Sequence, residues 1–313
     1  MVLTRETFTP ENVMMREAKD GTVPAKYQEL ILKDVMQNSK IMQLSQYVEM
    51  DDLAKTFQVF LDGPGAYWVD EGNRIQTSAP SYKNITIQAH KLAVILPVSN
   101  EYLKYQAGDF FSQMQPRIAE AFYKKFDEAA ILNIDNPFKF SLAQSSTAAK
   151  DDIQGDITYQ NILALEDKIT GNDNEPNAFI SKAQNNTALR NATLVQNGVV
   201  QSLYDRQNGE IDGLATVNLK STNMKKGELF AGDFDYAFYG IPGTIEYSIS
   251  NDAQLSTITG ADGKPINLFE QDMSALRATM TVGFMIVKDG AFSHLTPSAA
   301  AASTSSTSSS IGK

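Results

Sequence analysis

The segment LRATMTVGFMI, residues 276–286, carries an apolar side chain at every second position from Leu276 to Ile286. Arg277, Thr279 and Thr281 lie between these apolar positions. Because successive side chains of a strand point to opposite faces, the alternation predicts a long sheet strand with one buried face. A substantial sheet is therefore expected at the centre of the fold.

A helical pattern of similar length precedes this strand. Residues 109–132 hold apolar side chains at spacings of three and four, with charged side chains on the other face. The pattern predicts an amphipathic helix that packs on a sheet. Pro116 lies inside it, so the regular helix either begins near Ser112 or kinks at the proline. Ser99 can cap a helix that begins at Asn100.

Shorter patterns predict further elements of both kinds. We expect helices at Ala25–Asn38 and Tyr159–Thr170, and we interpret residues 185–209 as a polar connecting region. We expect strands at Ile41–Met50, Phe57–Leu61, Ile85–Ala89, Leu92–Val98, Ala178–Ile180, Leu214–Leu219, Thr244–Ile249 and within Glu228–Tyr239. Helices and strands do not alternate regularly, so the fold class is α+β rather than a doubly wound parallel sheet.

The stretch LDGPGAYWVDEGNRIQTSAPSYKN, residues 61–84, separates two of these strands and has few core-forming residues. A structureless loop of this length is uncommon inside a compact domain. We interpret it, with its flanking strands, as one hairpin that projects from the body. Tyr67 and Trp68 then either fold back on their own domain or contact another copy of the chain. We favour the contact, because an isolated hairpin is marginal in water and these aromatics are enriched at interfaces.

Composition narrows the function classes. Of 313 residues, 37 are Asp or Glu and 27 are Lys or Arg, which gives a net charge of −10. An acidic chain repels phosphate on average, which argues against a protein that reads nucleic-acid sequence. The absence of cysteine excludes disulfide scaffolds, zinc–thiolate sites and cysteine nucleophiles. No segment has the roughly 18 consecutive apolar residues of a membrane span, and the N-terminus lacks the apolar stretch of a secretory signal.

Residues that catalysis or metal binding would use are sparse. The two histidines, His90 and His294, have no paired spacing, and we interpret both as surface residues. Gly63-Pro64-Gly65 lacks the rest of a phosphate-binding motif and is expected to form a turn. Three groups of acidic residues do not match a calcium loop, and we interpret them as solvated faces: Asp51-Asp52, Asp151-Asp152 and Asp233 with Asp235. We predict no catalytic residue, cofactor or metal. A metal-assisted hydrolase at Asp233 and Asp235 is the contrasting hypothesis.

Six segments carry a family likeness, in the same order along the chain: AYWVDEGNRIQTSAPSYKNITIQAHKLAVILPVSNEYL (66–103), IAEAFYKKFDEAAIL (118–132), NAFIS (177–181), DGLATVNLK (212–220), GELFAGDFDYAFYGI (227–241) and NLFEQDMSALRATMTVGFMIVKDGAFSHL (267–295). In these segments the chain resembles the major capsid proteins of tailed bacteriophages with the Hong Kong 97-like fold. The likeness is greatest to head proteins of staphylococcal and related Gram-positive siphophages.

The resemblance implies a division of the chain: an N-terminal arm (1–24), a peripheral domain (25–55, 93–134 with its spine helix, and 266–297), an extended hairpin loop (56–92), an axial domain (135–265) and a flexible tail (298–313). It also implies that the extended loop lies over a neighbouring subunit. The loop residues expected at this contact are Tyr67, Trp68, Glu71, Arg74 and Tyr82.

The function that the resemblance implies is an icosahedral phage head, built from pentamers and hexamers, that encloses double-stranded DNA without reading its sequence. The short arm implies a separate scaffolding protein or a short cleaved leader, and a portal occupies one vertex. Assembly would take place in the host cytoplasm and the product would be the virion. We predict no covalent cross-link at Lys83 or Lys91. An encapsulin-like nanocompartment on the same fold is the alternative.

Overall fold

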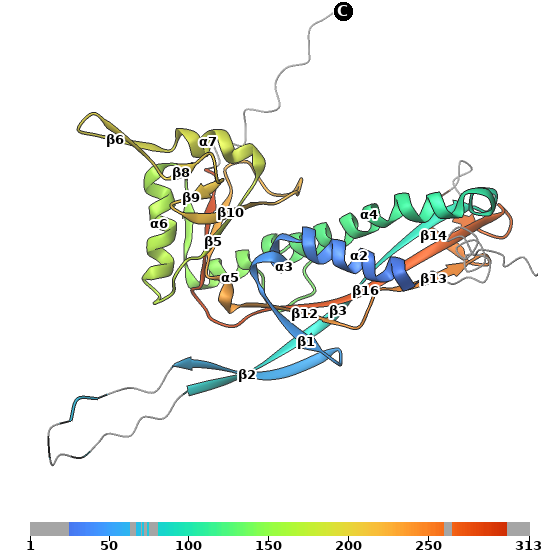
Figure 1. Cartoon of the computed structure of the whole chain (residues 1–313), viewed down its shortest axis with the longest axis horizontal. Helices are drawn as coiled ribbons and strands as arrows, with labels where there is room; N and C mark the ends of the chain where they lie inside the picture. The colour runs from blue at the N-terminus through green and yellow to red at the C-terminus, as the bar shows by residue number, and fades with distance from the viewer. Residues whose placement is uncertain are drawn as a thin grey trace, which may run out of the picture. The chain divides into compact units, whose positions relative to one another are not determined.

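The computed structural model of the chain describes residues 25–62, 67–69, 71, 74, 81–259 and 265–298 (Figure 1). They divide into two compact units, each assembled from separate parts of the sequence. Unit 1 takes its described residues from Met1–Ser39, His90–Phe126 and Ile241–Val282, and unit 2 from Lys40–Ala89, Asp127–Gly240 and Gly283–Lys313. The predicted arm, residues 1–24, and the predicted tail beyond residue 298 lie outside the described residues.

Helices and strands are mixed along the chain, which confirms the α+β class. The helices are α2 (Ala25–Asn38), α3 (Lys40–Leu44), α4 (Asn100–Leu132), α5 (Leu142–Ala149), α6 (Tyr159–Thr170) and α7 (Asn186–Asn191), with short 3₁₀ turns η1 (Ala183–Asn185) and η2 (Phe234–Tyr236). The strands are β1 (Gln46–Met50), β2 (Ala54–Asp62), β3 (Ser81–Ser99), β4 (Asp152–Gln154), β5 (Ala178–Ser181), β6 (Thr193–Gln196), β7 (Val199–Ser202), β8 (Tyr204–Asp205), β9 (Glu210–Ile211), β10 (Leu214–Asn218), β11 (Leu229–Gly232), β12 (Ala237–Pro242), β13 (Glu246–Ser250), β14 (Gln254–Thr259), β15 (Pro265–Asn267), β16 (Met273–Ile286) and β17 (Phe292–Thr296).

Helix α4 joins two predicted elements into one. It runs for 33 residues and passes through Pro116, so the helix expected at Asn100 and the amphipathic helix at 109–132 are continuous. The apolar stripe is buried at Ile118, Phe122 and Phe126, as its spacing predicts. Burial of this long stripe compensates for the hydrogen bond that the proline removes.

One sheet has the strand order β1-β12-β16-β3-β2, and β13 also pairs with β16. Strand β16 contains the alternating segment 276–286, and the apolar members of that segment are buried. At Gly283 an added Cβ would lie 2.6 Å from Ile87 Cγ2 and 3.0 Å from the Gln88 carbonyl oxygen. The close approach of β16 and β3 therefore requires glycine at this position.

A second sheet of unit 2 has the order β4-β17-β11-β5-β10-β9-β8. Helix α6 covers it, and Ile162, Leu165 and Ile169 of α6 enter the same buried cluster as Phe179. The Ser293 hydroxyl on β17 donates to the Leu165 carbonyl oxygen at 3.0 Å. Thr158 caps α6 by accepting a hydrogen bond from the Asn161 backbone N–H.

In unit 1, β13 pairs with residues 275–279 of β16 in antiparallel register, from Glu246↔Thr279 to Ser250↔Ala275. Strands β14 and β15 form a small separate hairpin sheet. Leu255, Leu268 and Ala275 form its buried cluster. The spacing-based predictions for Ala25–Asn38, Tyr159–Thr170 and Ala178–Ile180 are confirmed.

The predicted strand Ile41–Met50 is wrong in its first half, where residues 40–44 form helix α3. The carboxylate of Asp127 accepts hydrogen bonds from the backbone N–H groups of Lys40, at 2.9 Å, and Ile41, at 3.3 Å. A residue distant in sequence therefore caps this helix, and a local pattern cannot reveal such a cap.

Candidate functional site

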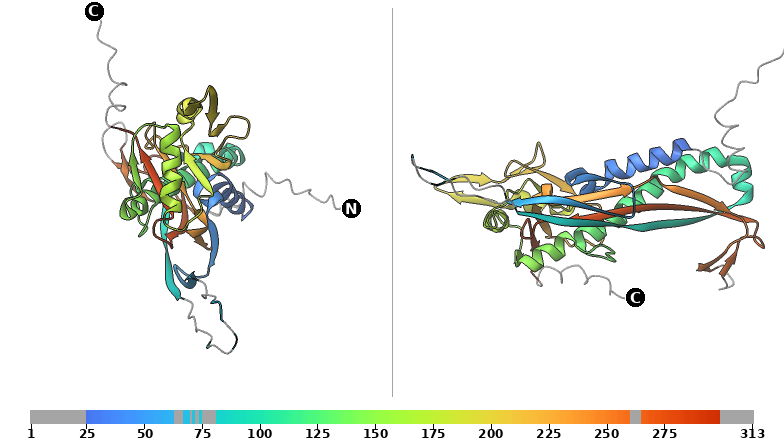
Figure 2. Two further views of the ribbon diagram at one scale, coloured as in Figure 1. Left: turned by 90° about the vertical axis from the view of Figure 1, so that its left-hand side faces the viewer. Right: turned by 90° about the horizontal axis from the view of Figure 1, so that it is seen from below.

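Strands β2 and β3 form the projecting ribbon that the sequence predicts, at the β2 edge of the sheet β1-β12-β16-β3-β2 (Figure 1, Figure 2). They pair in antiparallel register from Ala54↔Gln88 to Phe60↔Tyr82. The Thr56 and Thr86 hydroxyls lie 2.7 Å apart across the strands, which fixes the register on the exposed face. The predicted strands at Ile85–Ala89 and Leu92–Val98 are parts of one strand, β3.

The base of the ribbon is covered by its own unit. The rings of Phe57 and Phe238 lie 5.4 Å apart in an edge-to-face arrangement, and Ile85 and Ile87 are buried. The sequence shows no obvious partner for this hairpin within the chain, and the structure supplies one from β12. The need for another covering surface is therefore confined to the end of the ribbon.

The described residues at the end of the ribbon are exposed. Trp68 has a relative exposure of 105%, and Tyr67, Val69 and Tyr82 are also exposed. Glu71 and Arg74 lie in the same exposed stretch. Trp68 is therefore not folded back on the described residues of its own domain. The side chains of the five predicted contact residues make no hydrogen bond, ion pair or ring contact with other described residues, so they form an open surface rather than a pocket.

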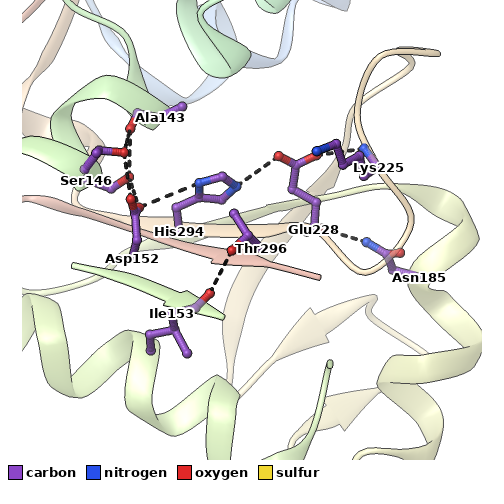
Figure 3. A network of polar contacts seen from close by, with 10 residues as sticks. Ala143, Ser146, Asp152, Ile153, Asn185, Lys225, Glu228, His294 and Thr296 are labelled. Atoms are coloured by element: carbon purple, nitrogen blue, oxygen red, sulfur yellow. Dashed lines mark hydrogen bonds and ion pairs between the residues drawn. The ribbon is translucent and has the colours of Figure 1, made fainter. Parts of the chain in front are cut away.

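His294 is buried, and the prediction of a surface histidine is wrong for this residue. Its ring stacks on Phe230, with centroids 4.0 Å apart and planes at 5°. Nε2 lies 3.0 Å from Glu228 Oε1, and Nδ1 lies 3.8 Å from Asp152 Oδ1 (Figure 3). Because a carboxylate only accepts, the imidazole donates through Nε2 to Glu228.

The carboxylates beside His294 are held by other groups as well (Figure 3). Asp152 accepts hydrogen bonds from the hydroxyls of Ser146 at 2.7 Å and Thr147 at 2.6 Å, and Glu228 Oε2 accepts from the Lys225 backbone N–H at 2.7 Å. Ser146 therefore faces a carboxylate rather than the imidazole, and the cluster does not have the geometry of a nucleophile activated by a histidine. It connects β4, β17 and the segment before β11.

Two predicted solvated acidic residues are instead buried. The Asp233 carboxylate accepts hydrogen bonds from the Asp235 backbone N–H, at 3.1 Å, and caps the turn η2. Burial raises the pKa of Asp233, and it also raises the pKa of Asp151, whose carboxylate accepts from Asn172 Nδ2 at 2.9 Å. Asp233 and Asp235 thus serve the turn between β11 and β12, and this use gives the hydrolase hypothesis no support.

We also searched the other described residues for a metal site, a membrane-spanning helix and a catalytic pocket. Among the described residues no three His, Asp or Glu side chains converge as a metal cluster. No helix in the described ranges is long and apolar enough to cross a membrane. A pocket of about 340 Å³ in unit 1 lies over β13 and β16 and is lined by Glu246, Tyr247, Ser248, Arg277 and Thr279 among others. No histidine is among the residues that line it.

The hairpin β6–β7 lies in the region that we expected to be a polar connection. Its turn is Asn197-Gly198, where both residues have positive φ, 51° and 78°. An Asn-Gly pair between short apolar runs is a strong hairpin signal, because two-residue turns of this type require positive φ. The signal LVQNGVV was therefore in the sequence, and the polar surroundings obscured it.

Comparison with known proteins decides the family. The model of the phage capsid family matches residues 20–296. The chain belongs to the phage capsid family. It is 52% identical over 293 residues to the major capsid protein of Staphylococcus phage 80alpha, which covers 93% of this chain and 90% of that protein. This capsid protein is thus a major capsid protein of a tailed phage, and its resemblance to staphylococcal head proteins is confirmed.

Solved structures agree with the fold. A protein of Mycobacterium phage Cain is similar with a TM-score of 0.66 and 19% identity, covering 95% of this chain and 96% of its own. A capsid chain of a native GTA particle gives a TM-score of 0.58 and 15% identity, covering 96% and 95%. Together with the phage capsid family match, they support the Hong Kong 97-like fold. The homologues are phage capsids and not encapsulins, so the encapsulin alternative is wrong.

Proposed function

We propose that this capsid protein assembles into an icosahedral shell of pentamers and hexamers around double-stranded DNA, and that the end of the β2–β3 ribbon holds neighbouring copies together. The observation that carries the proposal is the full exposure of Trp68. The contact residues are Tyr67, Trp68, Glu71, Arg74 and Tyr82.

The energetics favour such a contact. An aromatic side chain buries roughly 150–250 Å², which at about 25 cal/mol per Å² stabilises a contact by about 4–6 kcal/mol before entropic losses. Every copy presents the same ribbon, so the same contact repeats through a closed shell. Glu71 and Arg74 carry opposite charges beside the aromatics, and this pair can select the register of the contact.

Membership of the phage capsid family supports further proposals about assembly. The GTA particle was solved with five-fold symmetry, which supports rings of five for this chain as well. We propose that a separate scaffolding protein and a portal take part, that assembly occurs in the host cytoplasm, and that the finished shell is part of the virion. The net charge of −10 suits a container, because a lining that does not grip phosphate lets DNA move during packaging.

The single tryptophan makes the contact directly measurable. In dispersed subunits Trp68 should show the red-shifted emission and strong acrylamide quenching of a water-exposed indole. In shells the emission should shift to the blue and the quenching should fall, because the neighbouring copy covers the ring. Emission and quenching that stay unchanged on assembly would contradict the contact.

Variants of Trp68 separate the contact from folding. Trp68→Ala should reduce the yield of shells at least tenfold, while Trp68→Phe, which keeps an aromatic ring, should assemble close to the wild-type yield. Both dispersed subunits should unfold at the wild-type denaturant concentration, since the indole touches no other described residue. Normal shell yield from Trp68→Ala would remove the role assigned to this side chain.

A further inference from the structure

The tripeptide Gln-Asn-Gly occurs twice in the chain, at residues 196–198 and 207–209. The first copy contains the turn of the β6–β7 hairpin, and the second lies in the turn between β8 and β9 (Figure 1). An asparagine followed by glycine is prone to spontaneous deamidation, because the glycine has no side chain to shield the backbone between them. Two identical local sequences in different surroundings therefore show what the fold adds to their reactivity.

Deamidation of an asparagine needs no enzyme, cofactor or oxidant. The backbone nitrogen of the following glycine attacks the side-chain carbonyl carbon Cγ, so a new N–C bond forms while the bond from Cγ to the amide nitrogen breaks. Ammonia leaves with the proton that the glycine nitrogen gives up, and a cyclic imide remains. Water then opens the imide at Cγ or at the backbone carbonyl, which gives aspartate or isoaspartate. Both reacting groups must therefore be free to approach each other.

At Asn208 both reacting groups are held by Asp205. The Asn208 side-chain amide donates from Nδ2 to Asp205 Oδ2 at 3.0 Å, and the Gly209 backbone N–H donates to the Asp205 carbonyl oxygen at 2.9 Å. The other carboxylate oxygen of Asp205 accepts the Gln207 backbone N–H at 2.8 Å. The attacking nitrogen and the leaving amide are thus tied to one residue, and these hydrogen bonds must break before the two groups can react.

At Asn197 the corresponding groups are open. Neither the Asn197 side-chain amide nor the Gly198 backbone N–H makes a hydrogen bond to another described residue. Both residues are exposed, and a Cβ added at Gly198 would meet nothing within 4 Å. Water therefore reaches this turn, and no neighbouring side chain blocks the attack.

The β6–β7 hairpin also changes conformation more easily than the β8–β9 turn does. Strands β6 and β7 form a separate two-stranded sheet and pair with no other described strand, whereas β8 and β9 belong to the seven-stranded sheet. A sheet of two short strands is marginal in water, so it opens locally at a low cost in free energy. Opening frees the backbone rotation that brings Cγ of Asn197 to the Gly198 nitrogen.

We propose that Asn197 is a site of spontaneous deamidation, and that Asn208, in the same tripeptide, is protected by its hydrogen bonds to Asp205. The product adds a carboxylate to residues 193–203, a segment that has no charged residue. Isoaspartate also lengthens the backbone, which a two-residue turn cannot accommodate. The tip of the hairpin is therefore where the subunit changes chemically as it ages.

Peptide mass spectrometry of the full-length chain tests the proposal. Trypsin cuts after Arg190, Arg206 and Lys220, so the two asparagines lie on different peptides. Dispersed subunits are incubated at mildly alkaline pH, where the attacking nitrogen loses its proton more readily, and fragmentation assigns the modified residue. We expect Asn197 to convert at least tenfold faster than Asn208 in the folded protein. Equal rates at the two sites would overturn the proposal.

The unfolded chain is the matched control. In guanidinium chloride the two tripeptides should convert at rates within about threefold of each other, because only the fold distinguishes their hydrogen bonds. A tenfold difference that persists in denaturant would assign the selectivity to sequence and overturn the role of the fold. A folded rate at Asn197 more than about a hundredfold below its unfolded rate would show that the closed turn protects it, which also contradicts the proposal.

Two variants separate the roles of the residues. Asp205→Ala releases the Asn208 amide, so the rate at Asn208 should rise several-fold while the rate at Asn197, measured in the same sample, stays unchanged. Asn197→Gln keeps an amide but requires a larger ring, so conversion at this position should stop. An unchanged rate at Asn208 in Asp205→Ala would contradict the protection by Asp205. Circular dichroism of dispersed subunits checks that both variants fold.

Discussion

Glu166, in α6, is a carboxyl group whose surroundings oppose its ionisation. One of its carboxylate oxygens is buried and has no hydrogen-bond partner among the described residues. Burial, followed by the neighbouring carboxylate of Asp212, raises the pKa of Glu166 from 4.5 to about 7. The folded subunit therefore holds a proton that the unfolded chain releases at lower pH.

We expect this residue to make the stability of dispersed subunits depend on pH. Between pH 4.5 and about 7 the folded state binds more protons than the unfolded state, so the free energy of unfolding falls as the pH rises through this window. Glu166→Gln should flatten that slope and raise the melting temperature at pH 8 by about 2–4 °C. Calorimetry across the window tests it, and an unchanged slope would contradict the assignment.

His294 should contribute to the stability of unit 2 rather than to chemistry. His294→Ala removes the stacking on Phe230 and leaves Glu228 without its imidazole donor. We expect the free energy of unfolding to fall by about 2–4 kcal/mol in denaturant titrations of dispersed subunits. His294→Gln retains an N–H donor, so it should lower the free energy of unfolding by less than the alanine variant does. A change below about 0.5 kcal/mol in the alanine variant would show that the cluster is not stabilising.

At the scale of elements, the close pairing of β16 and β3 depends on Gly283, which has no side chain. Gly283→Ala would place a methyl group 2.6 Å from Ile87 Cγ2 and 3.0 Å from the Gln88 carbonyl oxygen. Since the Gln88 oxygen is a backbone atom, the two strands must move apart. We expect the free energy of unfolding to fall by about 2 kcal/mol or more.

The matched comparison for Gly283 is Gly198→Ala in the β6–β7 turn. An added Cβ at Gly198 meets nothing within 4 Å, but the φ of +78° strains an alanine. We therefore expect the free energy of unfolding to fall by about 1 kcal/mol. Denaturant titration of both variants measures the difference. Equal losses would indicate that backbone strain, and not strand contact, sets the effect at Gly283.

Elements with a long uninterrupted period could be predicted from the sequence. The alternation at 276–286 and the stripe at 118–129 each repeat one buried face, and the structure has them as β16 and α4. Helix α3 could not be predicted, because the Asp127 carboxylate that caps it is 87 residues away from Lys40. A local window contains the helix but not the group that holds its end.

The candidate site could be predicted in part from the sequence, again because its strands have a regular pattern. The β2–β3 ribbon follows from its alternation and from the lack of core residues between its strands, and the exposure of Trp68 agrees with that interpretation. The burial of His294 could not be predicted, because Phe230 comes from β11, Glu228 from the segment before β11 and Asp152 from β4. The five contact residues and the domain boundaries that the resemblance implies stay predictions.

At the scale of the whole molecule, the net negative charge should prevent dispersed subunits from binding DNA. With a net charge of −10, dispersed subunits should not retard duplex DNA in a mobility-shift assay at about 0.15 M salt. Enclosure of DNA would then require a closed shell, measured as nuclease-protected DNA in purified particles. Micromolar binding of DNA by dispersed subunits would contradict a container that holds its contents by geometry alone.

Strand β17 lies between β4 and β11 in the second sheet of unit 2, and the ribosome makes it after every other strand of that sheet. Strands β4 and β11 have no ladder with each other, so they can be joined in the sheet only after Phe292–Thr296 has been made. Prematurely terminated chains that stop short of this strand cannot complete the sheet. We therefore expect chains that end before Phe292 to leave this sheet incomplete and to be missing from assembled heads.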